Sequence, residues 1–197
     1  MSGNALLAAG LARVHRLLPR ATGCVYTAMF IDTRGLGDVP DDVCPLGARR
    51  VEVADVPRVA AVYVWGTAEP TVLALHGWGT DSTAMSAVVD VVTRNGESVM
   101  CFDAPGHGVS PGSQATITEY AGAISAVLQH FVSIHTIVAH SLASIAAVAA
   151  VAESDASAVR TVILLAPACS LAGVLDRWAG DRQLPAGVAS LISRELE

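Results

Sequence analysis

The chain has 197 residues, of which 52% are hydrophobic and 15% charged, and its formal net charge is -6. These values exclude a disordered chain and are typical of one globular unit with a large buried core. The 12 Lys and Arg residues are scattered rather than clustered, which argues against a nucleic-acid partner.

The cysteines lie far apart and form no C-x-x-C pair: Cys24, Cys44, Cys101 and Cys169. Scattered thiols argue against zinc and are typical of a reducing compartment, so we expect a cytoplasmic protein. No two histidines stand four residues apart with an acidic partner. We therefore expect no metal and no other cofactor.

The longest apolar segment, residues 134–152, is interrupted by His135, His140 and serines. A membrane span needs about 20 mostly apolar residues without such interruptions, so we do not expect one here. The first basic residue is Arg13, and a secretory leader would carry basic residues earlier.

The first residues predict an amphipathic helix. Leu7, Leu11, Val14 and Leu18 are four, three and four residues apart, and Pro19 follows, so the helix should end before that proline. Residues 1–30 are assigned to this helix and a connection. We expect the helix to pack on the domain or on another protomer rather than on a membrane surface. Residues 32–48, rich in Asp, Gly and Pro, predict a loop.

Two extended runs, residues 50–53 and 59–65, predict an antiparallel hairpin. From Pro70 onward, short apolar runs alternate with helical periods: TVLALHG, SVMCFDAPG, TIVAHS and TVILLAPA are each followed by a helical pattern. This alternation predicts an α/β fold with a mostly parallel sheet and helices on both faces.

Two of these helices have clear start signals. One has an apolar stripe at Met85, Val88, Val89 and Val92, opened by Asp81 or Ser82 and closed by Asn95-Gly96. The other begins with Thr116 and Glu119, whose spacing predicts a capping box.

Residues 136–144, TIVAHSLAS, are typical of a nucleophile elbow. A β-branched run ends at His140-Ser141, and an alanine-rich helical segment follows at once. A serine on such a turn presents its hydroxyl beside the free N–H groups of the helix. The pattern therefore favours acyl-transfer chemistry.

Three motifs in this order resemble the α/β-hydrolase family, in particular its single-domain serine hydrolases of the esterase and lipase type: HGWG at residues 76–79, DAPGHGVS at 103–110 and AHSLA at 139–143. The resemblance covers residues 49–168, which we assign to the core with strands one to six. It implies that Ser141 is the nucleophile and that the backbone N–H groups of Trp78 and Leu142 form the oxyanion hole. The residues that support the motifs are His76, Gly77, Asp103, Gly106, His107 and His140.

The elbow departs from the family pattern G-x-S-x-G because alanines flank the serine, and Ser144 stands where another glycine is frequent. Among the nearby histidines, the resemblance gives His76 and His107 local loop roles and points His140 away from the acyl site. No histidine follows Ser141, and we find neither a catalytic acid nor a base. Two functions therefore stay open: hydrolysis of a carboxylic ester or thioester with a hydrophobic acyl group, or a catalytically impaired remnant or non-catalytic binding module.

The last part of the chain predicts a sixth strand over residues 161–165 and then two helices of a partial lid over residues 169–197. Their apolar stripes are Leu171, Val174, Leu175 and Trp178, and Val188, Leu191 and Ile192. The family normally continues with a seventh and an eighth strand, so we expect a chain truncated within the lid and incomplete at its C-terminus. The edge of the sixth strand would then be open to a partner or to self-association.

Overall fold

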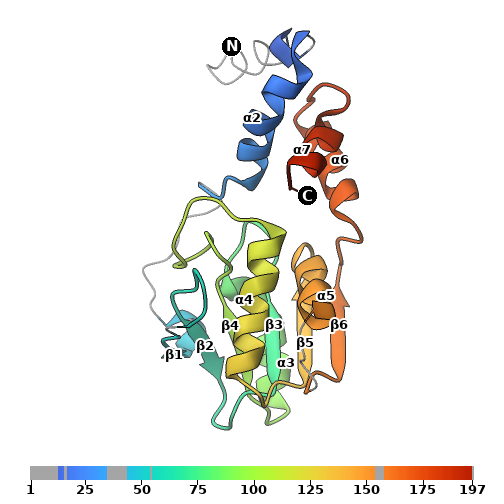
Figure 1. Cartoon of the computed structure of the whole chain (residues 1–197). Coiled ribbons are helices and arrows are strands. Elements are labelled where there is room, and N and C mark those ends of the chain that lie inside the picture. Colours follow the sequence, from blue (N-terminus) through green and yellow to red (C-terminus); the bar gives the residue numbers. More distant parts are fainter. Residues whose placement is uncertain (1–12, 16, 35–43, 54, 154–157, 197) are drawn as a thin grey trace. The chain divides into compact units, whose positions relative to one another are not determined.

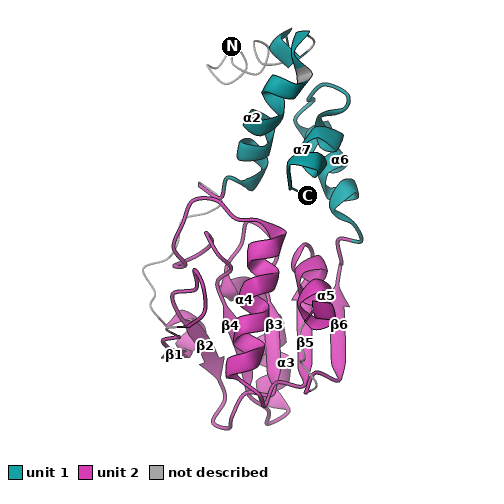
Figure 2. Ribbon diagram, viewed as in Figure 1, with its two compact units in different colours: residues 1–32, 169–197 teal, residues 33–168 magenta. Residues whose placement is uncertain are grey.

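A computed structural model describes the chain except for residues 1–12, 16, 35–43, 54, 154–157 and 197. The chain forms two compact units, shown in different colours in Figure 2: residues 33–168 make one, and residues 1–32 together with 169–197 make the other. The two units are described separately below.

The larger unit is built on a six-stranded sheet with the order β1-β2-β4-β3-β5-β6 (Figure 1). The strands are β1 Arg49–Val51, β2 Val62–Trp65, β3 Val72–Leu75, β4 Val99–Phe102, β5 Thr136–His140 and β6 Thr161–Leu165. Strand β2 pairs antiparallel with β1 and β4, whereas β4, β3, β5 and β6 are parallel. The predicted α/β class with a mostly parallel sheet and an antiparallel hairpin is confirmed.

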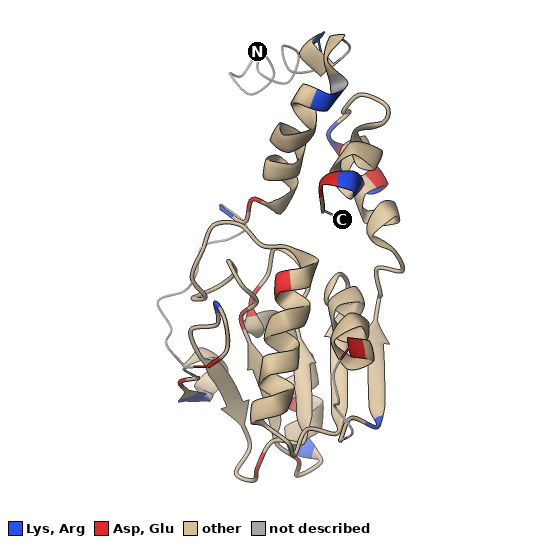
Figure 3. Ribbon diagram, in the orientation of Figure 1, with Lys and Arg blue, Asp and Glu red and all other residues tan. Residues whose placement is uncertain are grey.

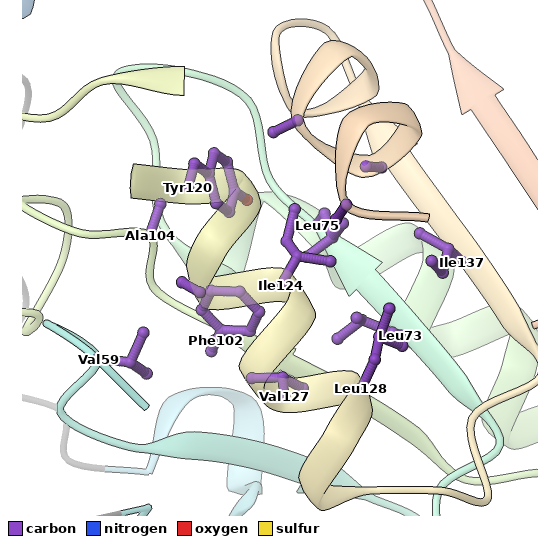
Figure 4. Close-up of a cluster of buried hydrophobic side chains, with 14 of the residues drawn as sticks. Val59, Leu73, Leu75, Phe102, Ala104, Tyr120, Ile124, Val127, Leu128 and Ile137 are labelled. Carbon is purple, nitrogen blue, oxygen red and sulfur yellow. The ribbon is translucent and has the colours of Figure 1, made fainter. Parts of the chain in front are cut away.

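Helices cover both faces of this sheet, as predicted. Because side chains alternate along a strand, Leu73 and Leu75 lie in one core with helices α4 (Ile117–His130) and α5 (Ala143–Glu153). Figure 4 shows part of this core. Val72 and Ala74 face the opposite side of the sheet and lie in a second core with Met85 and Val89. Met85 belongs to the 3-10 turn η2 (Ser82–Met85), and Val89 belongs to helix α3 (Ser86–Arg94). Strands β3, β4 and β5 contain no Lys, Arg, Asp or Glu, which agrees with their burial on both sides (Figure 3).

The predicted helix signals are present. Asp81 accepts a hydrogen bond from the Thr83 N–H at 2.8 Å and so opens η2. Thr116 and Glu119 form the full capping box of α4, each side chain accepting from the backbone N–H of the other. These contacts satisfy N–H groups that the first turn of a helix leaves without partners.

Among its described residues, the smaller unit includes the helices α2 Pro19–Ile31, α6 Leu171–Asp181 and α7 Val188–Leu196. The two helices predicted for residues 169–197 are confirmed. The buried core of this unit consists of Tyr26, Phe30, Leu175, Val188 and Ile192. The apolar stripes of α6 and α7 therefore pack against α2.

Helix α2 corrects the prediction for the first 30 residues. The segment after Leu18 is not a connection but a 13-residue helix. Proline opens it because the first position of a helix needs no N–H. Leu7 and Leu11 of the predicted helix lie outside the described residues, and the Val14 and Leu18 side chains are exposed.

Three further observations concern the described residues. None of their helices has the length and apolarity that a membrane crossing requires. Cys24 and Cys101 are free thiols. Strand β6 ends the sheet, and the side chains of Ile163, Leu164 and Leu165 are exposed there.

Candidate active site

Ser141 occupies a strained turn between β5 and α5. Its φ is 54°, a left-handed backbone conformation that residues other than glycine, asparagine and aspartate rarely adopt. Strand β5 ends at His140 and α5 begins at Ala143, so only Ser141 and Leu142 join the two elements. This is the strand–turn–helix context that a nucleophile elbow requires.

The flanking residues show why the elbow tolerates alanine and serine instead of glycine. Ala139 and Ala143 are completely buried, so there is room for one methyl group on each side of the turn. The Ser144 hydroxyl donates to the Ala139 carbonyl oxygen at 3.3 Å and is also buried. Its polarity is therefore satisfied within the turn.

The HG segment lies directly beside Ser141. Strands β3 and β5 are parallel neighbours in which Leu75 pairs with Ala139, so the residues that follow each strand meet at the same edge of the sheet. A Cβ atom placed on Gly77 would lie 3.2 Å from Ser141 Cβ and 3.0 Å from His140 Nδ1. A glycine is needed at residue 77 because the backbone of this segment approaches the elbow so closely.

The two predicted oxyanion donors follow these neighbouring segments. Trp78 comes next after Gly77, and Leu142 comes next after Ser141. Among the described residues, the Leu142 N–H donates no backbone hydrogen bond, which is typical of the first N–H groups of a helix. A developing oxyanion could therefore receive it.

His76 is a structural residue of this segment. It is completely buried. Its Nε2 accepts from the Ala104 N–H at 2.9 Å, so its Nδ1 carries the proton and donates to the Gly77 carbonyl oxygen at 2.8 Å. Burial lowers its pKa to about 4, because desolvation disfavours the charged imidazolium. Since both ring nitrogens are engaged, His76 has no lone pair free to accept a proton from Ser141.

Asp103 organises the loop of the second motif. Its buried carboxylate accepts hydrogen bonds from the Ser82 N–H at 2.8 Å, the Ser82 hydroxyl at 2.5 Å and the Val109 N–H at 3.1 Å. A Cβ on Gly108 would clash with this carboxylate, which explains the glycine there. These contacts give Asp103 a structural role.

Two glycines of the same loop have φ values that favour glycine, 69° at Gly106 and 49° at Gly108. Between them lies His107, which is buried. Its Nδ1 lies 3.0 Å from the Pro105 carbonyl oxygen. Burial also lowers the pKa of His107, so the ring is neutral at neutral pH.

The structure brings together Ser141, Leu142, His140, Gly77 and Trp78, but the described residues add no hydrogen-bonded acid–base pair to them. Within the described part of the chain, no hydrogen bond joins a histidine ring to a carboxylate. The same residues contain no group of three metal-ligating side chains.

The sequence did not identify two supporting contacts. The Tyr120 hydroxyl donates to the His76 carbonyl oxygen at 3.0 Å, and Ser82 binds Asp103. The sequence patterns assign Ser82 only to a helix start and give Tyr120 no polar contact. No local pattern distinguishes these roles, because both partners are distant in sequence.

A comparison with protein families matches residues 66–193 to the family described as serine aminopeptidase, S33. This match covers more than half of the chain. No curated protein matches the chain.

Several solved structures share the fold. An esterase from Pyrococcus furiosus has a TM-score of 0.57 and 20% identity, covering 76% of this chain and 62% of that one. A mutant of potato epoxide hydrolase has a TM-score of 0.55 and 17% identity, covering 68% and 46%. An esterase from Exiguobacterium antarcticum has a TM-score of 0.50 and 21% identity, covering 62% and 52%. The chain thus spans about half to three fifths of the length of these proteins, and such low identities establish the fold alone.

Proposed function

The chain belongs to the α/β-hydrolase family, and from this premise we propose that it hydrolyses a carboxylic ester or thioester with Ser141 as the nucleophile. The observation that carries the proposal is the φ of 54° at Ser141, on the turn between β5 and α5. A functional site retains such strain when the turn must present a side chain. The close approach of Gly77 to the same turn supports the assignment.

In this proposal the Ser141 hydroxyl oxygen attacks the carbonyl carbon of the substrate. The carbonyl oxygen becomes negatively charged and is stabilised by the N–H groups of Leu142 and Trp78. Loss of one such donor typically costs about 3 kcal/mol of transition-state stabilisation. The hydroxyl proton passes to a solvent water, since His76 is excluded as the acceptor by its hydrogen bonds. The alcohol or thiol of the substrate then leaves, and water hydrolyses the acyl ester formed on Ser141.

We propose an apolar acyl group because Trp78, one of the two predicted oxyanion residues, carries a partly exposed indole. The lid-type helices α6 and α7 add little to this argument, since Leu175, Val188 and Ile192 are buried in the core of their own unit. A cytoplasmic location and the association of β6 with a partner stay predictions.

A fluorophosphonate probe tests the nucleophile, because such probes phosphonylate activated serines. We expect the purified chain to be labelled and Ser141→Ala to be unlabelled. Ser86→Ala is the matched control, since Ser86 is exposed at the start of α3, and it should be labelled like the wild type. Equal labelling of the wild type and Ser141→Ala would refute the proposal.

The second candidate is a scaffold that binds a ligand without turnover. It is favoured by His76, whose two ring nitrogens are both engaged in hydrogen bonds. Removal of triad members still leaves a residual acceleration of about 10³ to 10⁴ over water, so weak ester cleavage would not decide between the two functions. Rapid ester turnover by this chain, abolished in Ser141→Ala, would exclude the binding module.

A further inference from the structure

His107 lies in a rigid turn next to the predicted oxyanion segment. Its own N–H donates to the Ala104 carbonyl oxygen at 2.9 Å, and its carbonyl oxygen accepts from the Ser110 N–H at 2.9 Å. With Nδ1 beside the Pro105 carbonyl oxygen, both backbone and ring are held by the turn itself. The ring therefore has one defined orientation.

That ring packs edge-to-face on Trp78. The ring centroids are 4.9 Å apart and the planes make an angle of 78°, within the range where aromatic pairs attract each other. Trp78 follows Gly77, whose backbone approaches Ser141. The contact thus connects the fixed turn at residues 104–110 to the segment that supplies one proposed oxyanion donor.

The other ring nitrogen distinguishes this role from that of an acid or a base. His107 Nε2 is buried, and among the described residues it has no hydrogen-bond partner. The contact that fixes the ring against Trp78 is therefore the edge-to-face packing of the two rings.

We propose that His107 is a positioning residue of the oxyanion hole, which sets the backbone of Trp78 through the ring-on-ring contact. The inference rests on the proposed function of Ser141 and on the donor role of Trp78. It predicts that the shape of the ring matters more than its nitrogens. Removal of the ring should therefore slow the reaction of Ser141 with an acylating or phosphonylating reagent.

Two substitutions separate ring from nitrogen. His107→Asn keeps an amide N–H for the Pro105 carbonyl oxygen but removes the ring, whereas His107→Phe keeps a ring and removes both nitrogens. We expect the rate constant of fluorophosphonate labelling to fall about tenfold or more in His107→Asn, because the Trp78 N–H would be misplaced as an oxyanion donor. In His107→Phe the rate constant should stay within about threefold of the wild-type value. His130→Asn is the control at an exposed histidine and should label like the wild type.

A double-mutant cycle with Trp78→Ala tests the route of the effect. If His107 acts through the indole, the pair His107→Asn and Trp78→Ala should label no more slowly than Trp78→Ala alone. Losses that multiply would overturn the proposal, since they would show an effect on stability or on another group. Labelling of His107→Asn at the wild-type rate would overturn it as well.

The labelling results distinguish a failure of the role of His107 from a failure of the proposed function. If the wild type is unlabelled, Ser141 is not an activated nucleophile, and the inference falls with it. If the wild type is labelled and His107→Phe reacts as slowly as Trp78→Ala, only the role of His107 is refuted. Thermal denaturation of each variant identifies any that does not fold. If His107→Asn does not fold, His107→Phe decides the question: labelling within about threefold of the wild type supports the role of the ring, and slow labelling refutes it.

Discussion

The backbone N–H of Ser141 donates a hydrogen bond to the carbonyl oxygen of Leu165 at 3.0 Å. The Ser141 carbonyl oxygen in turn accepts from the Ala168 N–H at 3.1 Å. The end of β6 and the residues after it thus hold the elbow from the side opposite β3. The strained conformation of Ser141 is stabilised by the neighbouring strand and not only by its own turn.

Replacement of Gly77 by alanine should disturb this elbow. The new Cβ would lie 3.0 Å from His140 Nδ1 and 3.2 Å from Ser141 Cβ, closer than ordinary contacts. We expect the labelling rate to fall about tenfold or more, because small displacements of catalytic groups are costly. Gly122→Ala is the control, since that glycine lies in α4 with no atom near its Cβ. It should stabilise the protein by up to about 1 kcal/mol and leave labelling unchanged. Normal labelling of Gly77→Ala would contradict the close approach.

The strain at Ser141 predicts a difference in stability between two variants that lack its hydroxyl. Ser141→Gly should be more stable than Ser141→Ala by about 1 kcal/mol, because glycine adopts a φ of 54° without steric cost. Chemical denaturation of both proteins measures this difference. Ala166→Gly offers a comparison at a φ of 43°, with the same direction expected. Equal stability of Ser141→Gly and Ser141→Ala would argue that the turn is not strained.

Asp103→Asn should destabilise the loop that carries His107. The amide would place a donor among three donors, the Ser82 N–H, the Ser82 hydroxyl and the Val109 N–H. We expect a loss of about 2–4 kcal/mol in the free energy of unfolding. Asp90→Asn, at an exposed helix position paired with Arg94, should cost less than about 1 kcal/mol. Similar losses for both variants would contradict the buried network.

His76 should make the protein less stable in acid. Its folded pKa of about 4 lies below its ordinary value of 6.5, so the unfolded chain binds more protons between these values. The contribution to stability is complete above pH 6.5 and falls as the pH decreases toward 4, by a few kcal/mol at most. Urea denaturation at several pH values measures this slope. The slope should be shallower in His76→Gln, although that variant is less stable throughout. An unchanged slope would assign the acid sensitivity to other groups.

Much of the larger unit could be predicted from local patterns. Each strand of the parallel part is a short apolar run with a turn signal after it. Thr116 and Glu119 mark the start of a helix, because the capping box is formed by contacts within a single turn. Helix α2, by contrast, is not predicted by any local pattern. Its segment PRATGCVYTAMFI has no clear polar face, so the periodicity that reveals an amphipathic helix is missing.

The sequence by itself determined the α/β class, the position of the elbow at Ser141 and the motifs around it, because these features depend on residues that are neighbours in the chain. Only the tertiary structure decided that Gly77 approaches Ser141, that Leu165 holds the turn and that His107 packs on Trp78. Those contacts depend on which strands are neighbours in the sheet, and strand order arises from the packing of the whole unit. Ser82 binds Asp103 for the same reason, since pairing over such a separation leaves no trace in local sequence.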